Sequence, residues 1–179
     1  MKKVIAFQIV SKSLLYSFLF LTLVVASASA ADIKVDLLTE EKGKQFNFEA
    51  GAVATLTPNA NGTGCNISAD FTNGGTKGQY WIPMTPFVDG PIAKFVMTAK
   101  ITGGTLQIGV RDPAKQIVSY TVPAINDTMQ TFDIELTKPL QKGEKGIITY
   151  PIKYVILFFA KKESEKMEVE IEKLTLVTN

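Results

Sequence analysis

The stretch Thr105–Val122, TLQIGVRDPAKQIVSYTV, decides how we expect the chain to fold. In its first half, apolar residues alternate with polar or small ones up to Arg111, which is the two-residue period of a half-buried β-strand. The turn sequence DPAK follows at 112–115, where proline presets one φ angle. A second alternating run begins at Gln116. The stretch is therefore predicted to form a β-hairpin.

The register of this hairpin follows if Arg111 pairs with Gln116 across the turn. Val110 then faces Ile117, and alternation predicts which side chains share the other sheet face. That predicted face consists of Gln107, Arg111, Gln116, Val118 and Tyr120. Because it offers a guanidinium, two amides and a phenol beside few apolar groups, it is the candidate surface for a polar ligand.

The rest of the chain after residue 30 repeats the two-residue alternation in short runs separated by glycine, proline and asparagine turns. No segment there has a convincing 3.6-residue period. About ten short strands without a helix predict an all-β fold, an antiparallel β-sandwich. The length and spacing favour a jelly roll over an immunoglobulin-like arrangement.

Four local expectations accompany this fold. The proline-rich segment 83–91 is predicted to be irregular, and the apolar run 154–160 to be covered on both faces. A change of phase in the last strand predicts a β-bulge near Glu172. The lone Cys65, which has no intrachain disulfide partner, is expected to be a small buried hydrophobe.

Residues 1–30 have the pattern of a cleavable signal peptide, with an early lysine pair, an apolar run over 14–25 and the small-residue sequence Ala-Ser-Ala at 28–30. Residues 31–179 then form one domain, secreted or periplasmic, that is not held in a membrane after cleavage. The alternative is a retained membrane anchor, but the apolar run is short for spanning a bilayer.

Composition excludes several classes of function. Residues 1–30 hold three of the 19 lysines and arginines, so the remaining chain carries 16 cationic side chains against 17 acidic ones. A near-neutral chain without a basic stripe argues against a nucleic-acid partner. The absence of histidine excludes Ser-His-Asp and Cys-His catalysis and histidine-ligated zinc.

The chain also resembles a known group of domains. The succession FNFEAG, ADFTNGG, QYWIPM, AKFVMTAK, LQIGVRDPAKQ, MQTFDIEL, IKYVILFF and MEVEIEKLTLV resembles the galactose-binding-like jelly rolls found beside glycoside hydrolases. The hairpin departs from that group's Arg-x-x-Asp-x-x-Gly-Gln pattern, because it is tighter and lacks the glycine. The resemblance implies a free-standing binder of polysaccharide or oligosaccharide, or an accessory protein to a glycoside hydrolase.

The hairpin face is the predicted ligand site. Gln107, Arg111 and Gln116 would donate hydrogen bonds to sugar hydroxyls, and Tyr120 would cover the C–H face of a pyranose. Tyr80 is added as a candidate contact because it lies beside a glycine-rich loop, whereas Trp81 is expected in the core. The alternative is a solvated sheet surface on which Arg111 pairs with Asp112, Asp133 or Glu135.

Two sets of acidic residues need an interpretation. Glu49 and Glu172 correspond to acidic residues that help hold a structural calcium in similar jelly rolls; the alternative is two solvated glutamates. The acidic residues of 163–172 could suggest a glycosidase carboxylate pair, but nearby lysines favour an ordinary charged surface.

We therefore predict an exported, non-catalytic carbohydrate-binding protein. A secreted structural or protein–protein interaction module is the alternative, and a carboxylate-dependent glycan-cleaving enzyme is the weaker one.

Overall fold

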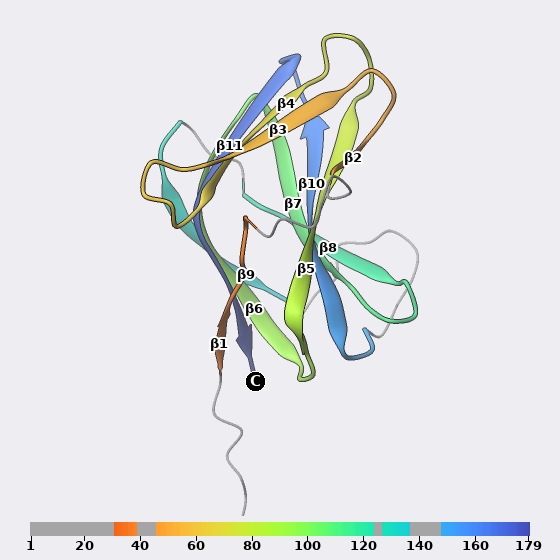
Figure 1. The fold of residues 1–179 in the computed structure, drawn as a ribbon, viewed down its shortest axis with the longest axis vertical. Coiled ribbons are helices and arrows are strands. Elements are labelled where there is room, and N and C mark those ends of the chain that lie inside the picture. The colour runs from red at the N-terminus through yellow and green to blue at the C-terminus, as the bar shows by residue number, and fades with distance from the viewer. Residues whose placement is uncertain (1–30, 39–45, 124–126, 137–147) are drawn as a thin grey trace, which may run out of the picture.

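The computed structural model describes residues 31–38, 46–123, 127–136 and 148–179, and its regular elements in these ranges are β-strands (Figure 1). The expected all-β fold without helices is confirmed for this part of the chain. The predicted signal peptide, residues 1–30, lies outside the described residues. Within the described ranges, no helix has the length and apolar character needed to cross a bilayer.

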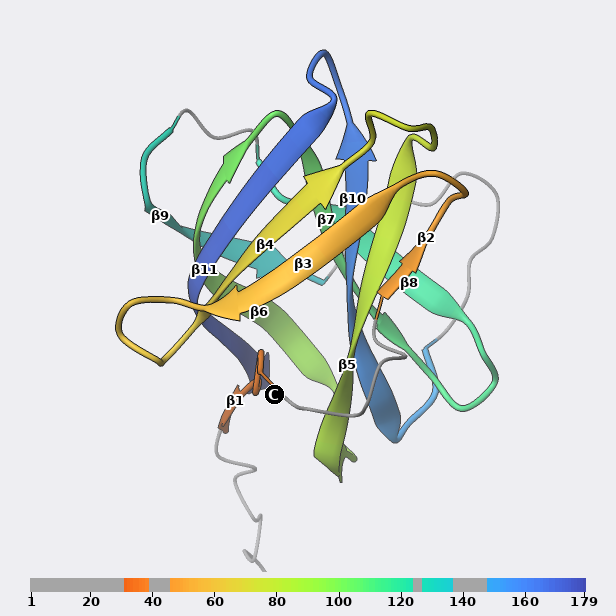
Figure 2. The same cartoon turned by 45° about the horizontal axis from the view of Figure 1, so that its top comes forward.

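The strands form two antiparallel sheets that face each other (Figures 1 and 2). Sheet A has the order β3 (Val53–Pro58), β4 (Cys65–Asp70), β11 (Lys166–Thr178), β6 (Ile92–Thr102) and β9 (Gln130–Glu135), and β1 (Asp32–Lys34) also pairs with β11. Sheet B has the order β2 (Phe46–Phe48), β5 (Lys77–Val88), β10 (Ile152–Lys161), β7 (Gly104–Arg111) and β8 (Ile117–Thr121). The predicted sandwich is confirmed.

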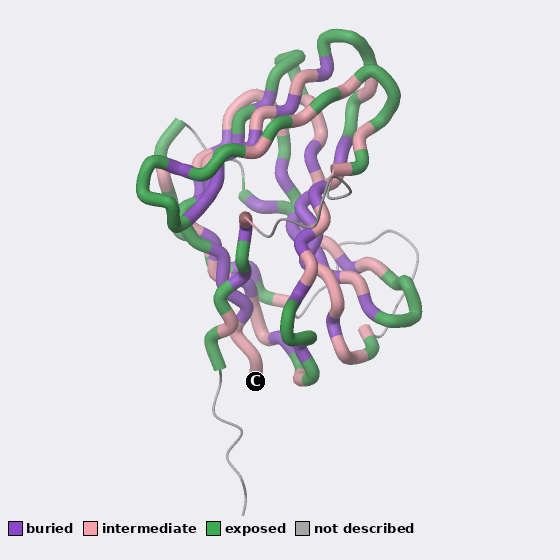
Figure 3. The backbone as a smooth tube through the Cα atoms, viewed as in Figure 1, coloured by how far each residue is buried: buried purple, intermediate pink, exposed green. Residues whose placement is uncertain are grey.

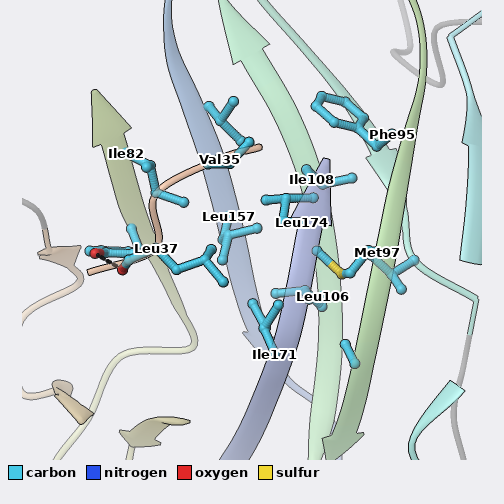
Figure 4. Close-up of a cluster of buried hydrophobic side chains, with 14 of the residues drawn as sticks. Val35, Leu37, Ile82, Phe95, Met97, Leu106, Ile108, Leu157, Ile171 and Leu174 are labelled. Carbon is cyan, nitrogen blue, oxygen red and sulfur yellow. Dashed lines mark hydrogen bonds between the residues drawn. The ribbon is translucent and has the colours of Figure 1, made fainter. Parts of the chain in front are cut away.

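The core lies between the sheets because the alternating apolar residues of each strand turn toward the other sheet. Figure 4 shows side chains from both sheets meeting there, with Leu106, Ile108 and Leu157 from sheet B opposite Met97 and Leu174 from sheet A. Figure 3 shows the alternation as buried segments that interrupt exposed ones along the strands. Cys65 is fully buried in this core, as expected.

Strand β11 contains the predicted bulge. Ile171 pairs with Ala99 and Lys173 with Thr98, so Glu172 is the additional residue opposite β6. The extra residue changes which positions face inward, and Ile171 and Leu174 are both fully buried. One bulge therefore keeps a thirteen-residue strand in contact with the core at both ends.

The prediction that 83–91 is irregular was wrong for its first part, since β5 continues to Val88. Proline cannot donate a ladder hydrogen bond and is tolerated where a strand has no neighbour on one side. Strand β2 pairs with β5 only at Gly78, Gln79 and Tyr80. Pro83 and Pro86 lie beyond that contact, where β10 is the one described strand that borders β5.

The central hairpin forms as predicted, but its predicted register was wrong by one residue. Arg111 pairs with Ile117, and Val110 pairs with Val118. Gln116 instead closes the turn: its backbone N–H donates to Asp112 Oδ1 at 2.8 Å, and its carbonyl oxygen accepts from the Asp112 N–H at 3.1 Å. Lys115 adopts a left-handed φ of 68° within this turn. The longer turn shifts all of β8 by one position.

Asp112 holds this turn against the segment that leads into β10. It is 3% exposed, and its Oδ2 accepts hydrogen bonds from the Thr149 N–H at 3.1 Å and the Thr149 hydroxyl at 2.8 Å. Burial alone would raise the pKa of the Asp112 carboxyl, but the hydrogen bonds from Thr149 and Gln116 together lower it below the ordinary value. The ionised form is therefore stabilised by folding.

Replacing this carboxylate should destabilise the protein in a pH-dependent way. We expect Asp112→Ala to lower the free energy of unfolding at pH 7 by about 2 kcal/mol, because a buried charged acceptor of several hydrogen bonds is lost. The folded-state pKa lies below the unfolded value of about 3.9, so this contribution is present above that value and is lost as the pH falls through the folded-state pKa. Urea denaturation at pH 7, and at the lowest pH where the wild type stays folded, measures the difference.

The exposed Asp89 provides the control, and Asp89→Ala should change the free energy of unfolding very little at either pH. An Asp112→Ala deficit of the same size at both pH values would contradict the assignment to the ionised carboxylate.

Candidate functional site

The outer face of sheet B is the side of that sheet that points away from the core. Its members alternate with core residues along each strand. They are Asn47 of β2; Lys77, Gln79, Trp81 and Pro83 of β5; Tyr154, Ile156, Phe158 and Ala160 of β10; Thr105, Gln107, Gly109 and Arg111 of β7; and Ile117, Ser119 and Thr121 of β8.

Strand pairing arranges these side chains in rows across the sheet. One row runs from Gln79 through Phe158 to Gln107. The next row places Trp81 beside Ile156, and the row after it places Tyr154 beside Arg111. Aromatic rings therefore occupy the middle strands, while amide and guanidinium groups flank them.

Arg111, Trp81 and Tyr154 form a contact cluster on this face. The Arg111 Cζ lies 4.8 Å from the centroid of the Trp81 ring, and the Trp81 and Tyr154 rings meet edge to face with centroids 5.5 Å apart. Ile156 is fully buried although it faces away from the core cluster. The outer face thus has a buried apolar residue of its own, paired with Trp81 on the neighbouring strand.

The sequence predicts that the apolar run 154–160 is covered on both faces, and the structure shows how far this holds on each face. Val155, Leu157 and Phe159 are buried in the core, and Ile156 is buried on the other side. Tyr154 and Phe158 are only half-buried. Coverage is complete on the core side and partial on the outer side.

A groove of about 400 Å³ adjoins the cluster along the strands. Its lining includes Phe158, the amides of Asn47, Gln79 and Gln107, and the charged side chains of Glu49 and Lys77. Gln79 Oε1 accepts a hydrogen bond from Trp81 Nε1 at 2.9 Å, and Gln107 Oε1 accepts one from the Ser119 hydroxyl at 3.2 Å. Among the described residues neither glutamine nitrogen has a partner, so both can donate to a ligand in the groove.

The structure brings together only two of the five predicted ligand residues, Gln107 and Arg111. Gln116 is exposed but belongs to the turn. Tyr120 faces the core, where its hydroxyl donates to the Leu136 carbonyl oxygen at 3.0 Å, because the one-residue shift of β8 reverses its side. Tyr80 is fully buried, and its hydroxyl donates to the Leu37 carbonyl oxygen at 2.8 Å.

Sequence reasoning also placed Trp81 in the core, and this was wrong. Consecutive strand residues point to opposite faces, so only one of Tyr80 and Trp81 can be buried there. Tyr80 takes the core position, packing on Phe46 with ring centroids 4.8 Å apart. Sequence analysis did not single out Tyr154, although its two-residue spacing from Ile156 and Phe158 was the available signal.

The alternative in which Arg111 forms a surface ion pair is contradicted. Asp112 is buried and bonded to Thr149 and Gln116. Asp133 belongs to sheet A and pairs with Lys94 at 2.7 Å. Arg111 makes its contact with the ring of Trp81 instead.

Glu49 and Glu172 do not form a shared metal site. The Glu49 carboxylate accepts hydrogen bonds from the Thr76 N–H and hydroxyl, beyond the end of β4, and these bonds lower the pKa of Glu49. Glu172 follows Ile171, which pairs with Cys65 at the start of β4. Glu49 and Glu172 therefore lie near opposite ends of β4, whose six residues separate the two carboxylates by roughly 15–20 Å. The described residues contain no group of three or more potential metal-ligating side chains.

Other candidate catalytic groups lie away from the outer face of sheet B. Burial raises the pKa of the Cys65 thiol to about 12, which leaves it protonated in the core. Glu168 is in sheet A, where its Oε1 accepts a hydrogen bond from the Ser68 hydroxyl at 2.7 Å. The glutamates of β11 are therefore part of the opposite sheet.

Comparison with known proteins identifies the fold. No family model matches the sequence, and none of the curated proteins matches it either. Among solved structures, the chain is similar to a family 11 carbohydrate-binding module from Clostridium thermocellum in complex with a β-1,3-1,4-mixed-linked tetrasaccharide. The TM-score is 0.53 at 16% identity, covering 84% of this chain and 96% of that one.

A family 29 carbohydrate-binding module complexed with mannohexaose is similar as well, with a TM-score of 0.55 and 13% identity over 84% of this chain and 93% of that one. An exo-β-agarase matches with a TM-score of 0.55 and 12% identity, over 83% of this chain and 25% of the agarase. The chain has the jelly-roll fold of carbohydrate-binding modules, which confirms the fold that the sequence resemblance implied.

The contact between Arg111 and Trp81 can be tested in solution, since Trp81 is the only tryptophan. We expect Arg111→Ala to uncover one side of the ring, shifting its fluorescence to longer wavelength and increasing quenching by acrylamide. The free energy of unfolding should fall by about 1 kcal/mol, because a partly exposed cation–π contact is lost. Lys162→Ala, in an exposed turn, should change none of these; unaltered quenching in Arg111→Ala would refute the contact.

Proposed function

We propose that the chain is an exported, non-catalytic carbohydrate-binding protein that holds a glycan on the outer face of sheet B. The observation that carries this proposal is the Arg111–Trp81–Tyr154 cluster next to a groove lined by glutamine amides. The likeness to modules solved with a tetrasaccharide and with mannohexaose supports it.

The chemistry of this face suits a sugar. Pyranose rings have apolar C–H faces that pack on aromatic rings, and Tyr154 and Phe158 are half-exposed on the middle strand. Sugar hydroxyls occur in adjacent pairs, which the free amide nitrogens of Gln79 and Gln107 can bind from the two flanking strands. A glycan lying along the groove would contact both kinds of group.

The proposal has two further parts: the protein binds the glycan without cleaving it, and the protein is exported. The described carboxylates nearest the groove and cluster, Glu49 and Asp112, are held by Thr76, Thr149 and Gln116, so neither is poised as a free acid or base. The signal-like pattern of residues 1–30 supports a secreted or periplasmic location. A glycoside hydrolase acting on the same glycan is the proposed partner, since a similar domain forms part of an exo-β-agarase.

Affinity electrophoresis in gels that contain single polysaccharides tests the proposal. The wild-type protein should be retarded by at least one of them. Trp81→Ala and Tyr154→Ala should weaken this retardation about tenfold or more, as loss of a central aromatic contact does. Gln107→Ala, an exposed position, should also weaken it without lowering the melting temperature.

Val53→Ala is the matched control, because Val53 is an exposed apolar residue on sheet A. It should leave retardation unchanged. Failure of every glycan to retard the wild type, combined with stable capture of another protein through the same face, would replace this proposal with an interaction module.

A further inference from the structure

Charge is divided unequally between the two sheets. The acidic residues that lie in described strands all belong to sheet A, and they are Asp32, Asp70, Asp133, Glu135, Glu168, Glu170 and Glu172. The strands of sheet B carry lysine and arginine only, at Lys77, Arg111, Lys153 and Lys161. On the outer face of sheet B these strands contribute Lys77, Arg111 and Lys153, whereas Lys161 faces the other side and pairs with Glu165 at 2.9 Å. The Glu49 carboxylate, just beyond β2, also lines the groove on the outer face.

Arg111 is the last residue of β7 on this face and is the only arginine of the chain. Its guanidinium lies over Trp81, and among the described residues it has no acidic partner within ion-pair distance. With its Cζ over the ring and no carboxylate partner among the described residues, this guanidinium keeps N–H groups available to donate. That arrangement suits a planar, bidentate anion such as a carboxylate.

Lys153, one residue before Tyr154, is a second cation that lies over an aromatic ring on this face. Val88 and Ile152 pair and are buried, so their neighbours Phe87 and Lys153 project toward the outer side. The pairing of β10 with β5 is irregular between Ile152 and Tyr154, which allows Lys153 and Tyr154 to lie on the same side. The Lys153 Nζ lies 5.5 Å from the centroid of the Phe87 ring, and Phe87 is 51% exposed. This cation, too, rests on an aromatic ring and is not neutralised by a carboxylate in the described part of the chain.

We propose that the glycan bound by this face is an anionic polysaccharide, whose carboxylate or sulfate groups are held by Arg111 and by Lys153. This inference rests on the proposed carbohydrate-binding function. Aromatic stacking would hold the sugar rings, and the two cations would select chains that carry negative charge. A neutral glycan would leave both cations with no anionic partner in the described part of the chain.

Pairs of polysaccharides that differ only in charge test the inference. Polygalacturonate is compared with its methyl ester, and a sulfated galactan with its desulfated form, so that a carboxylate and a sulfate are distinguished. We expect at least one charged member to bind about tenfold or more tightly than its neutral partner, as loss of a charge-assisted hydrogen bond predicts. Its binding should weaken as salt is raised.

Single substitutions test whether Arg111 and Lys153 cause the preference for charged glycans. Arg111→Gln should reduce the preference for the charged glycan over its neutral partner about tenfold, and Lys153→Gln should act in the same direction. Lys173→Gln removes the same charge from the exposed bulge region of sheet A and should have no effect.

The outcomes separate the two proposals. Equal or tighter binding of the neutral members would overturn the anionic inference and leave the carbohydrate-binding proposal standing. No binding to any member, or equal binding to poly-L-glutamate, would overturn the anionic inference, while retardation by any other polysaccharide would keep the carbohydrate-binding proposal. Selective binding that survives Arg111→Gln and Lys153→Gln would overturn the assignment to this face.

Discussion

Strand β10 is the constraint on which the rest of this molecule depends. It lies between β5 and β7, and its residues 155–157 and 159 are almost completely shielded from water although successive residues point to opposite sides. The core covers one side. On the other side Ile156 pairs with Trp81 of β5 and Gly109 of β7, and the Arg111 guanidinium lies over the Trp81 ring. A requirement of packing therefore places an aromatic ring and a cation on the surface of sheet B.

The sequence predicts the strands well because alternation is a local property. Each apolar run with a two-residue period became a strand, and the change of phase near Glu172 became a bulge. The pairing of two strands is less local, since it depends on how many residues the turn uses. The Asp112 carboxylate closes the turn on Gln116, and this single hydrogen bond decides that Tyr120 belongs to the core.

Burial of neighbouring aromatic residues was the second point that alternation could not settle. For Tyr80 and Trp81 the pattern states only that they face opposite sides. Tyr80 can satisfy its hydroxyl inside the core through the Leu37 carbonyl oxygen, while the Trp81 indole N–H finds Gln79 on the outer face. Hydrogen-bond partners therefore decide which of the two rings is buried. The partner of Trp81 is two positions away in the sequence, but the partner of Tyr80 is 43 positions away and comes near it only after folding.

The two sheets use their charges in different ways. On sheet A, cations such as Lys94 and Lys166 lie near aspartates, and exposed pairs of this kind contribute little to stability. On sheet B, Arg111 and Lys153 rest on aromatic rings, which attract a cation without neutralising it. The ring holds the side chain in place, so less conformational entropy is lost when an anion binds. The aromatic residues of this face thus offer surface for a sugar ring and hold the charge that would select the glycan.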